Sequence, residues 1–298
     1  MHHAPWSVDA PRLRLLTLNM AHGRRRSRHQ ALLRRSTLSA NLHHIAAVLR
    51  RESPDVVALQ EADGPSLWSG RFDHIHTLAR LAGYDHSFRG DHQRLSVGWR
   101  GHDVGLEYGT ALLSRLPLAD PHSQAFRESW RDTKGFVTAT AELPDGGGPV
   151  GLVSVHLDFL YPSVRRRQVE QLVEHVRHRT HPLVILGDFN CEWGRERGAL
   201  MLLARELSLQ PFVGEMRPTF PARRPVVCLD WILVSDELEF AAYRTLDDHL
   251  SDHLGVVAEV RRRQPGSRVR ETPGRVRVSR ARRPTARRAT PTDPPAVL

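Results

Sequence analysis

The chain has 298 residues, 40% of them hydrophobic, which is enough to bury the core of one large domain or two small ones. It contains no apolar run of about 18 residues, which excludes a membrane-spanning helix, and its start does not have the pattern of a secretory signal. Two cysteines, Cys191 and Cys228, are too few for a disulfide framework, so we expect a cytoplasmic protein.

The net charge of +10 is concentrated at the carboxyl end. Of 43 basic and 33 acidic residues, 12 arginines and two acidic residues fall in 261–298, which leaves 31 of each in residues 1–260. This tail is rich in Arg, Pro and Thr and poor in large apolar residues, so we expect it to be disordered. It could bind nucleic acid or an anionic membrane through phosphate contacts, but such tails also occur without a partner.

Short apolar segments rich in leucine or β-branched residues predict eight strands. In chain order they are residues 12–20, 55–61, 109–118, 135–143, 150–158, 182–190, 226–235 and 254–260. Amphipathic segments predict three helices, at residues 36–53, 164–179 and 196–209, and two long polar segments, 63–74 and 88–109, predict loops. Strands with few helices and no strict βαβ repeat favour a layered α/β sandwich of two sheets.

Polar side chains stand at the ends of many of these predicted strands. They are Asn19, Glu61, His156, Asp158, Asp188, Asn190, Asp230 and the pair Asp252-His253. Each alone is more simply a turn cap or a hydrogen-bonded core group, but their recurrence favours one shared site. Carboxylates suit Mg²⁺ or Mn²⁺, and a histidine beside an aspartate can activate water for attack on phosphorus.

Six motifs in this order resemble the endonuclease/exonuclease/phosphatase superfamily, which is related to deoxyribonuclease I. They are TLNM with Asn19, VALQE with Glu61, SVHLD with His156, LGDFN with Asp188 and Asn190, LDWILVS with Asp230, and LSDHLGV with Asp252 and His253. The resemblance covers residues 12–260 and leaves an N-terminal extension, 1–11, and the tail, 261–298, outside it. It implies a four-layered α/β sandwich, in which two packed mixed β-sheets are flanked by helices, with a phosphoesterase site for one or two metal ions.

The resemblance also implies a metal site. Glu61 matches the main metal ligand, Asn19 the asparagine near metal and phosphate, and Asp252 a second carboxylate on the metal side. The implied cofactor is Mg²⁺, with Mn²⁺ as the alternative.

Five further positions match catalytic residues of the superfamily. His253 matches the catalytic histidine and Asp230 its orienting partner; Asp188 matches the aspartate that positions the nucleophile or leaving group. Asn190 matches a phosphate contact, and His156 a phosphate-binding donor or general acid. Endonucleases acting at apurinic sites usually carry a tyrosine motif at the place of His156, which argues against base-excision repair.

The substrate side matches less closely. The segment with Tyr108 and Thr110 resembles the substrate-side strand, although an asparagine is common at the place of Thr110. Lys134, the only lysine in the chain, falls where members often have a basic residue, and either contacts a phosphate or is solvated. A second pair, Asp248-His249, lies upstream of the SDH motif, and we expect it to be part of a loop.

These observations predict a Mg²⁺-dependent phosphoesterase that we expect to be a monomer. A phospholipid or small phosphoester is favoured by the neutral body, and a DNA or RNA endonuclease by the basic tail. A non-catalytic binding module on the same fold is the alternative from another class, and the full set of catalytic residue types argues against it.

Overall fold

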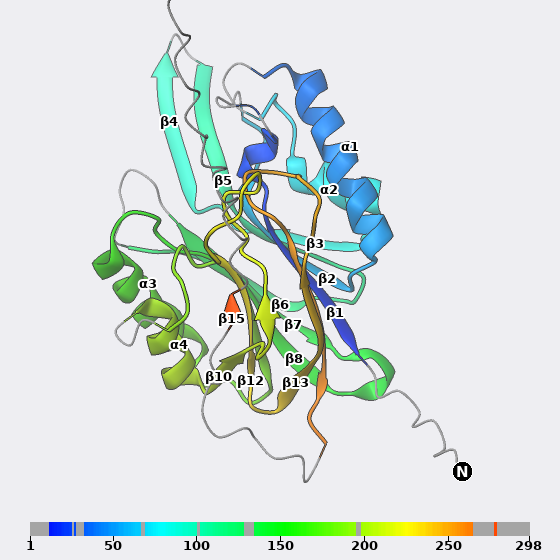
Figure 1. Ribbon diagram of the computed structural model, residues 1–298. Helices are drawn as coiled ribbons and strands as arrows, with labels where there is room; N and C mark the ends of the chain where they lie inside the picture. Colours follow the sequence, from blue (N-terminus) through cyan, green and yellow to red (C-terminus); the bar gives the residue numbers. More distant parts are fainter. Residues whose placement is uncertain are drawn as a thin grey trace, which may run out of the picture.

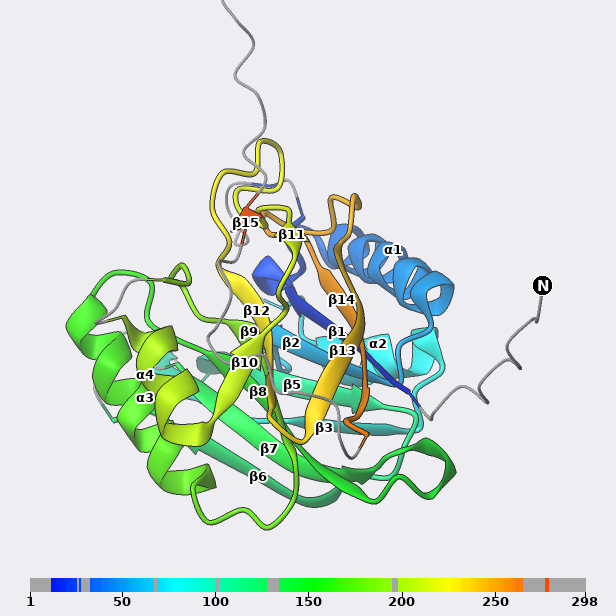
Figure 2. The same cartoon turned by 60° about the horizontal axis from the view of Figure 1, so that its bottom comes forward.

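Two β-sheets pack face to face, and a pair of helices covers the outer face of each (Figure 1). The computed structural model describes residues 12–25, 27, 33–66, 69–99, 102–127, 134–194, 198–264 and 277–278. Seen from the end, α3 and α4 flank one sheet and α1 and α2 the other (Figure 2). The predicted four-layered α/β sandwich is confirmed.

The first sheet has seven strands in the described part of the chain, in the order β13-β14-β1-β2-β5-β3 with β4 paired to β5. Their bounds are β1 (Leu13–Asn19), β2 (Val56–Asp63), β3 (His86–Arg89), β4 (Gln93–Trp99), β5 (His102–Ser114), β13 (Leu238–Thr245) and β14 (Val256–Arg262). β1 and β2 are parallel, and the other pairs are antiparallel. This sheet is therefore mixed.

The second sheet has six described strands, in the order β10-β12-β9-β8-β7-β6. They are β6 (Ala119–Ala125), β7 (Gly135–Glu142), β8 (Pro149–His156), β9 (Leu183–Asp188), β10 (Leu209–Pro211) and β12 (Asp230–Ser235). Its one parallel pair, β8 with β9, lies at the centre. A short parallel pair, β11 (Glu215–Met216) with β15 (Arg277–Val278), stands apart from both sheets.

Four α-helices and two 3₁₀ turns complete the described elements. They are α1 (Arg35–Glu52), α2 (His74–Ala82), α3 (Pro162–Val176), α4 (Ala199–Leu207), η1 (Ala21–Gly23) and η3 (Pro144–Gly146). None of the described helices is both long and apolar enough to cross a membrane.

Three apolar layers hold the sandwich together. The helices α1 and α2 pack on the first sheet through a cluster that includes Leu42 and Leu59, and α3 and α4 pack on the second through one that includes Val169 and Leu200. A third cluster, which includes Ile232, fills the space between the sheets. Burial of these side chains supplies the main driving force for folding.

All eight predicted strands and all three predicted helices are present, but the predicted loop 88–109 is wrong. Residues 93–99 and 102–107 form the two strands of a hairpin, β4 with β5. The segment has no proline, and apolar and polar residues alternate weakly along it, so backbone pairing outweighs its polarity. The short helix α2 was not predicted, because its nine residues follow the polar loop directly.

The basic tail begins later than its composition predicts. Arg261 and Arg262 belong to β14, where Arg261 Nε donates to Glu239 at 2.8 Å and Arg262 Nε donates to the Gly147 carbonyl at 2.6 Å. Apart from 263–264 and 277–278, the rest of the predicted disordered tail lies outside the described residues, as does the predicted extension 1–11.

A polar bridge crosses the apolar layer between the sheets. Gln60 Nε2 donates to Ser154 Oγ at 3.2 Å, and the Thr110 hydroxyl donates to the Ser154 carbonyl at 3.3 Å. Thr110 is fully buried, so its hydroxyl is engaged in joining the two sheets. The predicted substrate contact at Thr110 therefore receives no support from its position.

Burial of His92 predicts a loss of stability in acid. Its Nε2 lies 3.2 Å from the Phe136 carbonyl, and burial lowers the pKa of the imidazole to about 4. The unfolded chain takes up this proton first, so the stabilisation is complete above pH 6.5 and falls by up to about 3 kcal/mol as the pH drops towards 4. Urea unfolding of His92→Gln at several pH values should show a smaller decrease in the free energy of unfolding between pH 6.5 and 4 than the wild type shows. An unchanged slope, equal to that of the exposed control His43→Gln, would refute the assignment.

Candidate active site

The centre of each sheet brings polar side chains to one edge of the sandwich. Strands of a parallel pair end at the same sheet edge. In the first sheet β1 ends at Asn19, beside Glu61 of β2, and in the second sheet β8 ends at His156 and β9 at Asp188, in register. Asp230, the first residue of β12, pairs with Asp188. The fold thus gathers five of the predicted site residues from four central strands and their neighbour.

His253 reaches this edge from the loop that precedes β14. Because β14 is antiparallel to β1, its start lies beside the end of β1. The hydroxyl of Ser251 donates to the Asn19 carbonyl at 2.6 Å and accepts from the His253 amide at 2.9 Å. This serine fixes the loop 249–253, which carries His253 and is the candidate catalytic loop, to the first sheet.

Asp188 is the centre of the cluster. Its side chain is 1% exposed; its Oδ2 accepts from Asn19 Nδ2 at 2.9 Å, and its Oδ1 accepts from the Asn190 amide at 3.0 Å. The Nε2 atoms of His156 and His253 lie 3.5 Å and 3.8 Å from the same Oδ2. Two imidazoles and an amide therefore converge on one carboxylate oxygen.

The charged groups of this cluster shift one another's pKa. Burial and the neighbouring Asp230 raise the pKa of Asp188 to about 7, against the opposing effect of His253. His253 Nδ1 lies 2.9 Å from Asp230 Oδ2, so that Nε2 faces Asp188. Burial disfavours the imidazolium, but the charges of Asp230 and Asp188 outweigh it and raise the pKa of His253 to about 10.

Glu61 is presented by a distortion of its strand. It has a left-handed backbone (φ 52°) at a register shift between Gln60 and Ala62, as a β-bulge gives. Its Oε1 accepts from Asn19 Nδ2 at 3.3 Å, so this amide links Glu61 to Asp188. Burial disfavours the carboxylate, yet the charges of His22 and Lys134 outweigh it and hold the pKa of Glu61 well below its usual range.

Asp252 lies at the rim of the site. Its side chain is 40% exposed, and its Oδ2 is paired with Arg24 Nη2 at 2.6 Å. Among the described acidic and histidine side chains, the group whose ligand atoms lie within 4.8 Å of one another consists of Asp188, Asp230 and His253. The structure thus turns the predicted metal ligand Asp252 towards an arginine, and its metal role stays a prediction.

This geometry agrees with a family assignment from the sequence. The model of the Endonuclease/Exonuclease/phosphatase family matches residues 16–253, which include every site residue named above. The chain belongs to this family. No curated protein sequence matches it.

Solved structures with the same fold include other members of the family. A Beutenbergia cavernae endonuclease/exonuclease/phosphatase is 24% identical, with a TM-score of 0.67 over 85% of this chain and 72% of its own. The human Nocturnin catalytic domain, with bound sulfate, is 20% identical (TM-score 0.60; 85% and 96% covered). Staphylococcus aureus beta toxin, as a mutant with bound magnesium ions, is 15% identical (TM-score 0.61; 83% and 98% covered). At these identities the similarity establishes the fold.

The donors at the site of this family member fit a divalent cation. Asp230 Oδ1 is buried without a hydrogen-bond partner in the described structure, and a buried carboxylate oxygen is costly unless it is compensated. Glu61 is ionised and, through Asn19, adjoins Asp188. Such carboxylate oxygens are the ligands that Mg²⁺ and Mn²⁺ prefer, whereas no described cysteine belongs to the cluster.

Lys134 lies beside the Tyr108 ring and acts on the charge of Glu61; the substrate role of Lys134 and Tyr108 stays a prediction. Lys134 Nζ stands 5.9 Å from the centre of the Tyr108 ring, and the ammonium helps to keep Glu61 ionised. Lys134 directly precedes β7, whose first residue pairs with His156. Both side chains are buried, so a substrate would meet them only inside the site.

Asn190 follows β9 in a left-handed conformation (φ 51°). Its Nδ2 donates to the Leu157 carbonyl at 2.9 Å, which holds the side chain beside the end of β8. The glycine of the same GDFN motif is required by packing, since a Cβ at Gly187 would lie 2.0 Å from the Val155 carbonyl oxygen. The motif therefore combines a close approach of two strands with the placement of Asp188 and Asn190.

His22 is a member of this site that the sequence did not predict. Its Nδ1 lies 2.7 Å from Asp63 Oδ1 and its Nε2 lies 3.2 Å from Glu61 Oε2, while its ring meets Tyr108 edge-on at 5.1 Å. Burial lowers the pKa of His22, but the two carboxylates outweigh this and raise it. Ala21 and His22 both have positive φ, so a strained turn after Asn19 directs the ring. The available signal was a histidine two residues after the strand-end motif TLNM.

Removal of His22 should destabilise the protein. His22→Ala leaves Asp63 and Glu61 without the imidazole between them, and since the ring is 22% exposed we expect a loss of roughly 2 kcal/mol, below the cost of breaking a fully buried pair. Urea denaturation measures it, with His43→Ala on the exposed face of α1 as the control. Equal stability of the two variants would contradict the bridging role.

Proposed function

We propose that this chain is a divalent-metal-dependent phosphoesterase that hydrolyses a phosphate ester by in-line attack of a water molecule activated by His253. Its family generally acts on phosphoester bonds. The observation that carries the proposal is the convergence on Asp188 Oδ2 of Asn19 at 2.9 Å, His156 at 3.5 Å and His253 at 3.8 Å.

In this proposal neutral His253 accepts the proton of the water at Nε2; a bound cation would favour the neutral form, because it would offset the carboxylate charge of Asp188 that otherwise helps to raise the pKa of the imidazole. Its Nδ1 is engaged by Asp230 at 2.9 Å, which fixes the ring and leaves Nε2 for the reacting water. Thr219 Oγ1 in turn accepts from the Asp230 amide at 3.3 Å, so the strand start that carries this aspartate is held in place. Asp188 would position the attacking water, because its Oδ2 lies between the two imidazoles.

The charge that develops on the phosphoryl oxygens would be met by His156, Asn190 and Lys134. The side-chain amide of Asn190 is held by its hydrogen bond to the Leu157 carbonyl. Burial lowers the pKa of His156, and the charge of the nearby Lys134 lowers it further. Preorganised donors of this kind stabilise a transition state more than a flexible solvent does. A divalent cation held by Glu61, with Asn19 and Asp188 beside it, would neutralise phosphoryl charge when bound.

A metal-dependent screen tests the proposal. Full-length protein is assayed with Mg²⁺, Mn²⁺ or EDTA on bis-p-nitrophenyl phosphate, DNA, RNA, sphingomyelin and inositol phosphates. We expect turnover of at least one ester that EDTA abolishes. No turnover of any ester with any metal would leave the non-catalytic binding module as the better explanation.

A nuclease is the second candidate function, and the arginine-rich tail is the observation that favours it. If these arginines neutralise nucleic-acid phosphates, counterions are released on binding, and the affinity for DNA or RNA should fall steeply as the salt concentration rises. Full-length protein in which Arg280, Arg282, Arg283, Arg287 and Arg288 are replaced by glutamine tests the idea. Slower cleavage of DNA or RNA, with unchanged hydrolysis of bis-p-nitrophenyl phosphate, supports it, and equal loss on both substrates counts against it.

A further inference from the structure

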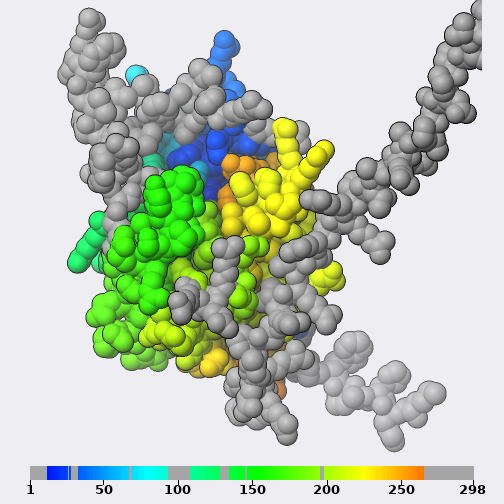
Figure 3. Space-filling view, turned by 60° about the vertical axis from the view of Figure 1, so that its left-hand side comes forward, coloured from blue at the N-terminus to red at the C-terminus, as the bar shows by residue number. Residues whose placement is uncertain are grey.

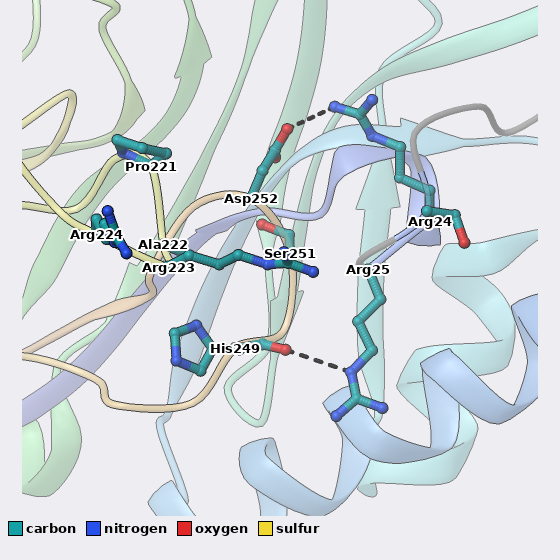
Figure 4. A pocket seen from close by; sticks show the side chains of 10 residues that line it. Arg24, Arg25, Pro221, Ala222, Arg223, Arg224, His249, Ser251 and Asp252 are labelled. Carbon is teal, nitrogen blue, oxygen red and sulfur yellow. Dashed lines mark hydrogen bonds and ion pairs between the residues drawn. The ribbon is translucent and has the colours of Figure 1, made fainter.

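A cavity of about 650 Å³ opens beside the catalytic loop. Three segments far apart in the sequence form it, and the described residues that line it are Arg24, Arg25 and Ser27 from the first, residues 221–224 from the second, and His249, Ser251 and Asp252 from the third. Figure 4 shows Arg24 and Arg25 on one side, Arg223 and Arg224 on the opposite side, and the 249–252 loop between them. The blue, yellow and orange segments that contain these residues meet on one face of the molecule (Figure 3). This volume is that of a small-ligand site.

The lining of this arginine cavity is strongly basic. Among the described residues that line it, four are arginines, Arg24, Arg25, Arg223 and Arg224, and one, Asp252, is acidic. Residues 1–260 as a whole hold equal numbers of basic and acidic residues, so this excess is local. Guanidinium groups bind phosphate through paired hydrogen bonds, which makes a phosphate the anion that such a cluster recognises.

Two of these arginines are available for a ligand. Arg223 and Arg224 are exposed, and neither has an acidic partner in the described part of the chain. Arg24 is paired with Asp252 at 2.6 Å, and Arg25 Nε donates to the His249 carbonyl at 3.4 Å. Arg24 and Arg25 are therefore held by contacts within the protein, whereas the side chains of Arg223 and Arg224 can bind an anion.

The arginine cavity is joined to the catalytic loop through the backbone. The Ala222 amide donates to the Asp252 carbonyl at 2.7 Å, and Asp252 directly precedes His253. On the other side, Ser251 donates to the Asn19 carbonyl. A substrate whose reacting phosphorus lies at His253 would place its next few atoms in or near this cavity.

We propose that the arginine cavity binds a second phosphate of the substrate, carried by the same molecule as the ester that is cleaved. The proposal rests on the proposed function and specifies its substrate class: a molecule with two or more phosphates, either a nucleic-acid strand or a small phosphorylated ester. A choline phospholipid fits poorly, since its headgroup carries a fixed positive charge that four arginines repel.

The test compares two substrates that differ by one phosphate. They are the 3′-(p-nitrophenyl phosphate) of thymidine with and without a 5′-phosphate, and a dT8 oligonucleotide provides the nucleic-acid arm. The variant is Arg223→Ala/Arg224→Ala in the full chain. The matched control is Arg166→Ala/Arg167→Ala, which removes two exposed arginines from α3.

We expect the 5′-phosphate, or the oligonucleotide, to lower the KM of the wild type by about tenfold or more, as one charge-assisted contact allows. The cavity variant should lose most of this gain and keep its activity on bis-p-nitrophenyl phosphate, and the control should keep both. A gain with dT8 alone identifies a nucleic-acid strand, whereas a gain with the 5′-phosphate identifies a small ester as sufficient.

Binding separates this proposal from the proposed function. Fluorescence anisotropy with a phosphorothioate dT8 and with thymidine 3′,5′-bisphosphate as competitor, both in EDTA, measures the arginine cavity without turnover. If the wild type hydrolyses nothing yet binds these probes more tightly than the cavity variant, the proposed function fails and the anion site stands. If the variant binds as the wild type does, or loses bis-p-nitrophenyl phosphate hydrolysis to the same extent as the other substrates, the anion site is refuted.

Discussion

Replacement of His253 by alanine is expected to lower kcat by about 10³-fold with little change in KM, the range that loss of a positioned general acid or base gives. The ring is buried, is held by Asp230 at 2.9 Å, and its Nε2 faces Asp188. Steady-state kinetics on the best ester of the screen measures the effect, and thermal unfolding shows whether the variant is folded. A kcat within tenfold of wild type would remove His253 from the reaction.

Asp230 should act through His253, and a double variant distinguishes this from an independent role. We expect Asp230→Asn to lower kcat by about 10²-fold, and Asp230→Asn combined with His253→Ala to be no slower than His253→Ala alone. The control is Asp248→Asn, from the other Asp-His pair, whose carboxylate is paired with Arg51 at 2.6 Å on the surface. Multiplicative losses in the double variant would assign Asp230 a separate function.

Residues at the ends of strands were the predictable part of the site. Asn19, His156 and Asp188 end three strands of the central parallel pairs, so their meeting follows once the strands and their pairing are known. Sequence patterns identify where a strand ends, and the parallel arrangement converts that end into a place in space. This is why motifs spread over some 230 residues were sufficient to predict one cluster.

His22 and the surroundings of Asp252 were not predictable in the same way. His22 depends on two consecutive residues with positive φ, a conformation that neither side chain prefers by itself. The partner of Asp252, Arg24, is 228 residues away in the chain and is brought there by the pairing of β14 with β1. Contacts made by turns depend on tertiary structure, which outweighs local preference.

The folded structure concentrates positive charge at a place that the charge distribution along the sequence does not indicate. The sequence places the excess of arginine in the tail, and the body is neutral in number. Folding nevertheless brings two short arginine pairs, 24–25 and 223–224, to one cavity beside the catalytic loop. A neutral count therefore conceals a local field that can attract an anionic substrate.

Replacement of Glu61 is the variant that separates metal binding from proton transfer. Glu61→Ala is expected to lower kcat/KM by about 10³-fold or more and to weaken Mn²⁺ binding by about 100-fold, because in the proposed function the ionised carboxylate beside Asn19 would be the hard donor that holds the cation. Glu61→Gln should bind metal almost as poorly, since an amide oxygen carries no charge. Isothermal titration with Mn²⁺ measures the affinity directly.

A thermal shift gives a readout that is independent of turnover. A metal that binds only the folded protein raises its melting temperature, so Mg²⁺ or Mn²⁺ should stabilise the wild type and the His253→Ala variant but not Glu61→Ala. Glu170→Gln, an exposed carboxylate on α3 paired with Arg166, is the control and should respond as the wild type does. If Glu61→Ala keeps both its melting shift and its metal-dependent activity, the cation is held elsewhere, and the group formed by Asp188, Asp230 and His253 becomes the metal centre.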